Sequence, residues 1–201
     1  ESWKKNPIFF QKKIMHQLLK KGLNTKFGAD HSFAQIKTYD DFKRNVPIRD
    51  YEGFSEYIER IKSGEKNILW PGTPKYFCKT SGTTSGTKYI PLTNDSIKNH
   101  LTAARDAILA YIHETKDTSI STGKMIFLQG SPELEQTKNI PTGRLSGIVA
   151  HHIPFYLKSN RLPSFESNCI EDWEEKINAI VNETKNKNMT LISGIPPWVQ
   201  M

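Results

Sequence analysis

Apolar residues near the start of the chain recur at the spacing of a helix. Asn6 and Pro7 stand before them, a pair that suits the cap and first turn of a helix, and Gly22 ends the run. The apolar positions are Phe10, Ile14, Met15, Leu18 and Leu19. We expect this face to pack on the body of the domain, although docking of the helix on a membrane surface or on another protein stays open.

Further stretches with the same periodicity predict helices later in the chain. One covers residues 51–62, and another begins at Thr93 or Asn94, either of which suits a helix cap. A last helix is expected to begin at Ser167 or Asn168. Its inward residues are expected to be Ile170, Trp173, Ile177, Ile180 and Val181.

Short apolar runs between these helices predict strands. They fall at residues 76–78, 89–93, 125–128 and 190–193. The polar stretch between Gly130 and Gly147, which contains Pro132, Pro141 and Gly143, predicts a long loop. Because helices and strands alternate, we predict an α/β fold in which a sheet is flanked by helices, without an internal domain boundary.

Composition narrows the class of protein. Of the 201 residues, 36% are hydrophobic and 24% are charged, which is typical of a globular protein that can bury a core. The chain lacks an apolar run of about 18 residues and a signal-peptide core, so we expect no membrane span, no membrane partner and a cytoplasmic location. Cys78 and Cys169 lie far apart without metal-binding spacing, which predicts reduced thiols and no metal ligands.

The net charge of +7 allows several kinds of anionic partner. The basic residues do not form one block, since pairs such as Lys12-Lys13 and Lys20-Lys21 are followed later by stretches such as Glu174-Glu175-Lys176. This pattern favours a solvated surface over a nucleic-acid interface. A non-catalytic nucleotide- or RNA-binding module, or an interaction domain that docks through its first helix, remains the alternative to an enzyme.

The segment Thr80–Lys88 carries the most specific chemistry. It reads Thr-Ser-Gly-Thr-Thr-Ser-Gly-Thr-Lys and lies between two predicted strands. Glycines let backbone N–H groups approach a phosphate, hydroxyls donate further hydrogen bonds, and a lysine supplies a positive charge. The Walker phosphate loop does not fit, because only three residues separate Gly82 from Gly86 and Thr87 comes before the lysine. We therefore predict a phosphate-binding loop that joins two strands and folds over a nucleotide.

This loop resembles the phosphate-gripping loop of the adenylate-forming acyl ligase superfamily, with Ser85 and Thr87 replacing the usual glycine and proline. Within that superfamily the chain resembles the auxin-responsive, acyl-acid amido synthetase branch in its bacterial form. The supporting stretches are residues 46–51, 58–64, 88–93 and 193–198. The resemblance covers only the N-terminal part of such an enzyme, because the family's downstream Tyr-x-x-Ser/Thr-Glu and Tyr-x-x-Gly-Asp segments are not found.

The resemblance implies a fold, a reaction and site residues. The fold would be the N-terminal portion of the large adenylate-forming domain. The reaction would use ATP and Mg²⁺ to activate a carboxylic acid as an acyl-adenylate, which then passes to an amine, expected to be an amino acid, to give an amide.

The resemblance also implies site residues. Lys88 would be the catalytic residue, stabilising charge on the departing pyrophosphate. The residues expected to hold the β- and γ-phosphates are Ser81, Gly82, Thr83, Thr84, Ser85 and Gly86. The isolated fragment is expected to be inactive, and an uncovered apolar face around residues 195–199 is expected to favour self-association.

Other candidate residues carry weaker signals. His151 and His152 are adjacent, so they cannot face one metal from a regular element, and a structural or pocket-lining role is favoured. Residues 193–198 and 129–132 each follow a predicted strand, where ligands of α/β sheets often bind.

Overall fold

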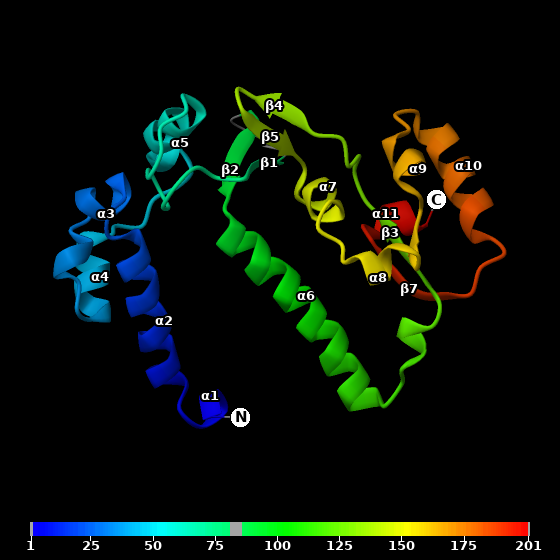
Figure 1. Cartoon of the computed structure of the whole chain (residues 1–201), viewed down its shortest axis with the longest axis horizontal. Coiled ribbons are helices and arrows are strands. Elements are labelled where there is room, and N and C mark those ends of the chain that lie inside the picture. Colours follow the sequence, from blue (N-terminus) through cyan, green and yellow to red (C-terminus); the bar gives the residue numbers. More distant parts are fainter. Residues whose placement is uncertain (1, 81–85, 201) are drawn as a thin grey trace.

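Two separate sheets organise the chain in the computed structural model, which describes residues 2–80 and 86–200. Figure 1 shows the N-terminal helices at one end, the first sheet in the middle, and the second sheet with its helices at the other end. The predicted α/β class is confirmed, although two sheets take the place of the single expected one.

The first sheet has the strand order β2-β1-β5-β4. Strands β1 (Tyr76–Thr80) and β2 (Lys88–Leu92) form an antiparallel pair, and β5 (Ile140–Gly143) lies parallel to β1 on its other side. Strand β4 (Glu135–Thr137) is antiparallel to β5. Because β2 is at the edge of the sheet, Pro91 can occupy it without breaking a ladder between two neighbours.

The prediction of a long loop between residues 130 and 147 is wrong. This segment contains β4, β5 and the beginning of α7 (Leu145–Ala150). Ile140 and Thr142 are 5% and 0% exposed, and Thr142 pairs with Phe77 of β1. Pairing with β1 and packing on the core therefore stabilise strands in residues 130–147. The prolines and glycines of this segment obscure the periodicity that would have predicted these strands.

The second sheet is entirely parallel, with the order β6-β3-β7. Strand β3 (Lys124–Leu128) lies between β6 (Arg161–Leu162) and β7 (Met189–Gly194). The strands predicted at residues 125–128 and 190–193 are confirmed. Leu128 is in register with Gly194, so the carboxyl ends of β3 and β7 lie side by side.

The N-terminal region is helical. Its elements are α1 (Ser2–Lys5), α2 (Pro7–Gly22), α3 (Lys26–Asp30), η1 (Phe33–Gln35), α4 (Tyr39–Asn45), η2 (Glu52–Phe54) and α5 (Ser55–Lys62). Helix α2 has the predicted bounds, and the Asn6 side chain accepts a hydrogen bond from the Phe9 N–H at 3.3 Å. Leu19 is buried, whereas Ile14 and Leu18 are 54% and 50% exposed, so only part of the predicted face is covered.

The remaining helices follow the first hairpin. They are α6 (Asn94–Thr115), η3 (Ser119–Ser121), α7, α8 (Phe155–Lys158), α9 (Phe165–Cys169), α10 (Trp173–Thr184) and α11 (Pro196–Val199). Thr93 caps α6, as predicted. The single helix expected from Ser167 or Asn168 is wrong: Ser164 caps α9 and Asp172 caps α10, so the segment divides into two, and Val181 is 49% exposed.

Apolar clusters cover both faces of β1. Phe77, which is fully buried, joins one cluster with Ile58, Ile61, Ile68 and Ile140. Its neighbours Tyr76 and Cys78 point to the other face, because side chains alternate along a strand, and join Ile97 and Ile148. The hairpin β1–β2 is thus anchored by packing on two sides. Within the described residues, no helix is long and apolar enough to cross a membrane.

Candidate functional site

The first hairpin places the two ends of the predicted phosphate loop side by side. Thr80 and Lys88 are the last cross-strand pair, so the loop joins two antiparallel strands as predicted. Gly86 has a φ of +84°, which favours glycine, and a Cβ atom there would meet nothing within 4 Å among the described residues. The predicted site residues Ser81, Gly82, Thr83, Thr84 and Ser85 lie outside the described residues. Of the predicted site, the structure therefore locates Gly86 and Lys88.

Lys88 differs from Lys79 and Lys62, two other lysines near the hairpin, in its electrostatic surroundings. The Lys79 ammonium forms an ion pair with Glu135, and the Lys62 ammonium pairs with Glu59 at 2.6 Å. Among the residues that the structure describes, Lys88 forms no ion pair, and its Nζ atom lies 5.3 Å from the centroid of the Tyr51 ring. A half-buried positive charge without a carboxylate partner thus stands at the base of the loop, where it can attract an anion.

Tyr51 contacts both this lysine and the next residue of the edge strand β2. Its hydroxyl accepts a hydrogen bond from the Tyr89 N–H at 2.8 Å and lies 3.5 Å from the Tyr89 carbonyl oxygen. The periodicity of residues 51–62 indicates only an apolar role for Tyr51, so sequence reasoning missed this contact. The available signal was weak: Tyr51 closes the stretch 46–51, one of those that resemble the amido synthetases.

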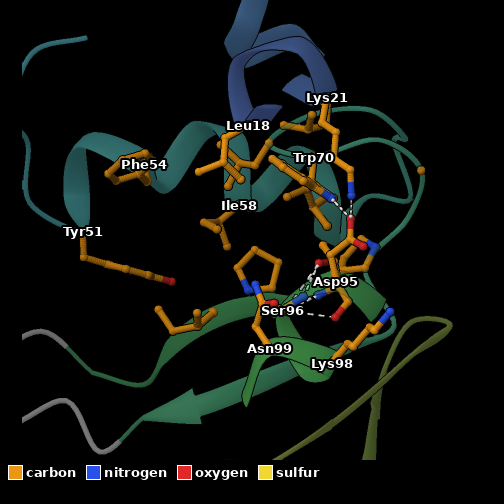
Figure 2. A pocket seen from close by; sticks show the side chains of 18 residues that line it. Leu18, Lys21, Tyr51, Phe54, Ile58, Trp70, Asp95, Ser96, Lys98 and Asn99 are labelled. Atoms are coloured by element: carbon orange, nitrogen blue, oxygen red, sulfur yellow. Dashed lines mark hydrogen bonds and ion pairs between the residues drawn. The ribbon is translucent and has the colours of Figure 1, made fainter. Parts of the chain in front are cut away.

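A cavity of about 680 Å³ borders the same hairpin (Figure 2). Its walls are mainly apolar and include Phe54, Ile58, Ile61, Ile68, Ile90 and Pro91. At one end the Asp95 carboxylate accepts hydrogen bonds from Lys21 at 2.9 Å and from the Trp70 indole at 3.1 Å, and these two contacts hold the pKa of Asp95 below its usual value. The size suits a small molecule, but these polar groups already satisfy one another.

The two segments predicted as candidate sites lie side by side at the carboxyl ends of the strands of the second sheet. Residues 129–132 follow β3 and residues 195–198 follow β7, whose ends are in register. The Trp173 and Trp198 rings meet with centroids 5.4 Å apart. The Gln129 Nε2 atom is buried and has no hydrogen-bond partner among the described residues.

His151 and His152 make separate structural contacts. The Nε2 atom of His151 lies 2.8 Å from the Pro132 carbonyl oxygen, and that of His152 lies 3.2 Å from the Tyr76 hydroxyl. Burial lowers the pKa of His152, with a smaller contribution from the nearby Lys75 charge. The two side chains tie the end of α7 to the segment before β4 and to β1. Within residues 2–80 and 86–200, no group of three or more His, Cys, Asp or Glu residues is placed to hold a metal ion.

Comparisons with known proteins agree on one family. The model of the GH3 family N-terminal domain matches residues 1–194. The indole-3-acetic acid-amido synthetase GH3.15 of Arabidopsis thaliana is 31% identical over 106 residues, and GH3.3 of the same plant is 26% identical over 96 residues. These matches cover 51% and 47% of this chain but only 18% and 16% of the two relatives, so the matched segments span less than a fifth of the relatives' length.

Solved structures show the same relationship at the level of the fold. The structure of the GH3.15 acyl acid amido synthetase superposes with a TM-score of 0.66 at 20% identity, covering 86% of this chain and 30% of that one. A second structure, of AtGH3.15 in complex with 2,4-DB, gives 0.60 at 22% identity and covers 71% of this chain and 25% of that one.

Proposed function

The chain belongs to the GH3 family, and on that premise we propose that it is the phosphate-binding N-terminal segment of an ATP-dependent acyl acid amido synthetase. In the complete enzyme, the carboxylate of an organic acid attacks the α-phosphate of ATP, which gives an acyl-adenylate and releases pyrophosphate. An amine, which we propose to be that of an amino acid, then attacks the acyl carbon, and an amide and AMP are the products.

One observation carries the proposal: Lys88 lacks a carboxylate partner among the described residues and stands where a loop rich in glycine and hydroxyl groups rejoins the sheet. Its ammonium is the group that we expect to stabilise the negative charge that develops on the departing pyrophosphate. The β- and γ-phosphates would be held by hydroxyl and N–H groups of residues 81–86. Gly86 suits this role, because it has no side chain and, among the described residues, nothing blocks the approach of a phosphate to its backbone.

Mg²⁺ would accompany the ATP phosphates. Among the described residues no cluster of three carboxylate, histidine or cysteine side chains is suited to a metal, so we assign no ligand and no step to the ion in this segment.

The acid is proposed to be apolar apart from its carboxylate. The names of the relatives refer to indole-3-acetic acid and to 2,4-DB, and both belong in a test panel. The test is ATP–pyrophosphate exchange by the complete protein with each acid. Exchange with none of a broad panel of acids would contradict the proposal.

We predict that Lys88→Ala lowers the exchange rate about 100-fold, because one donor to developing charge is lost, and changes the KM for ATP much less. Lys79→Ala is the matched control: it removes the same charge from the neighbouring strand, where Glu135 already neutralises it. The control should keep its exchange rate within about threefold of the wild type. Equal losses in both variants would mean that the hairpin was disturbed and that Lys88 has no special role.

A further inference from the structure

The edge strand β2 leaves one row of backbone groups without a neighbouring strand. At Tyr89, directly after Lys88, the N–H that faces away from β1 donates to the Tyr51 hydroxyl at 2.8 Å. Tyr51 thus takes the place of a strand partner at the point where the loop returns to the sheet. This contact joins residues 38 positions apart in the sequence.

The same side chain also touches Lys88. The ammonium lies 5.3 Å from the Tyr51 ring centroid, which is within the range of a cation–π contact. A lysine has a flexible four-carbon stem, so a ring that restrains its head lowers the entropy lost when the ammonium meets an anion. One tyrosine therefore restrains both the backbone after the loop and the charge at its base.

Tyr51 is itself fixed. It packs against the apolar cluster that contains Ile58, Ile61 and Phe77, and Tyr89 packs against the same cluster. The Tyr89 ring is also in edge contact with Phe77, with centroids 5.9 Å apart. The apolar core thus holds Tyr51 in place, and Tyr51 in turn holds the residues that follow the loop. A solvent-exposed side chain could not fix them in this way.

We propose that Tyr51 is a positioning residue that presents Lys88 to the phosphates of the nucleotide. The proposal rests on the proposed function of the loop. The hydroxyl fixes the backbone at the beginning of β2, and the ring restrains the Lys88 ammonium. Loss of either should lower the rate of adenylation more than the affinity for ATP, because Lys88 acts on charge that is greatest in the transition state.

The experiment compares Tyr51→Phe, which keeps the ring, with Tyr51→Leu, which removes ring and hydroxyl, in the complete protein. Tyr57→Phe is the matched control, because it loses a comparable hydroxyl contact, 2.9 Å to Asp30, away from β2. We expect Tyr51→Phe to lower kcat for pyrophosphate exchange about fivefold, and Tyr51→Leu about 30-fold, each with a smaller change in the KM for ATP. The control should stay within about twofold.

Hydrogen exchange at the Tyr89 amide provides a readout that does not depend on activity. It should be about fivefold faster in Tyr51→Phe than in Tyr57→Phe, because only the former loses the bond to that amide. If the wild-type protein exchanges pyrophosphate with no acid, the proposed function fails, and the role of Tyr51 in presenting Lys88 to ATP falls with it, even if the amide exchanges faster. If exchange is present but Tyr51→Leu retains the wild-type kcat, or if Tyr57→Phe loses as much as Tyr51→Phe, the positioning role alone is overturned.

Discussion

The two sheets are held in place by different kinds of contact. Around the first sheet, both apolar clusters pack on β1, and their members come from α5, β5, α6 and α7 as well as from β1. Around the second sheet the fully covered groups are often polar: Ser167, Asn168 and Lys176 are 8%, 1% and 6% exposed. The candidate phosphate loop emerges from the region with the apolar core.

Hydrogen bonds hold the helices of the second region together. The Glu183 carboxylate of α10 accepts the Ser164 N–H and hydroxyl, both at 2.7 Å, and the Ser167 hydroxyl at 2.5 Å. The Lys176 ammonium donates to the Asn168 carbonyl oxygen at 2.6 Å, and burial lowers the pKa of this lysine. Apolar packing does not depend on ionisation, whereas these contacts do. The stability of the apolar first region should therefore depend less on pH than that of the C-terminal region.

The largest effect is expected from a cavity in the first region. Phe77→Ala should lower the free energy of unfolding by about 3–5 kcal/mol, because the side chain is fully buried between two sheet neighbours and helix α5. Urea unfolding measures the change. Ile192→Ala on β7, where the side chain is 60% exposed, is the counterpart in the second region and should stay within about 0.5 kcal/mol. Similar losses in both variants would erase the difference between the regions.

A smaller, pH-dependent effect is expected at Glu183. Burial raises the pKa of its carboxyl, but the hydrogen bonds from Ser167 and Ser164 outweigh burial and leave the pKa below the ordinary value. The native state therefore binds fewer protons than the unfolded state. The stabilisation is fully present above the unfolded pKa of about 4.3 and is lost as the pH falls through the native pKa.

Glu183→Gln should accordingly cost about 1–3 kcal/mol of unfolding free energy at pH 7, because an amide cannot replace a carboxylate as acceptor of all three bonds. The difference from the wild type should shrink as the pH falls below about 4. Glu171→Gln, at an exposed carboxylate of the same region, serves as the control and should leave the pH profile unchanged. If the difference in unfolding free energy between the two proteins stays constant down to pH 3, the contact of Glu183 with Ser164 and Ser167 does not depend on the charge of the carboxylate.

Sequence reasoning succeeded where local signals and tertiary packing agree. Helices α2 and α6 carry caps at Asn6 and Thr93 together with regular apolar spacing, and both were predicted at their observed starts. Strands β4 and β5 were missed because their stability comes from pairing, of β5 with β1 and of β4 with β5, and no local pattern records the contact with β1. The predicted single helix failed at residues 170–172, because two caps only eight residues apart, Ser164 and Asp172, both act.

The candidate site divides in the same way. The chemical identity of the loop is a local property, so its glycines, hydroxyls and Lys88 could be named from the sequence. The contact between Tyr51 and Tyr89 is a tertiary one and could not. The roles assigned to Ser81–Ser85 stay predictions, since these residues lie outside the described part of the chain.

The smallest effect on stability is expected at the exposed apolar end of the second region. Ile192, Ile195 and Val199 lie close together in the sequence and are 60%, 52% and 46% exposed, and exposed apolar side chains favour association with another surface. We predict that the chain self-associates through these residues and that Ile195→Asp weakens the association at least about tenfold while changing the unfolding free energy by less than about 0.5 kcal/mol. Sedimentation velocity over a range of concentrations measures the first quantity. Ile8→Asp makes the same chemical change at a residue of α2 that is 64% exposed, at the opposite end of the molecule (Figure 1). If Ile8→Asp abolishes self-association and Ile195→Asp does not, the associating surface belongs to the N-terminal helices and not to the end of the second region.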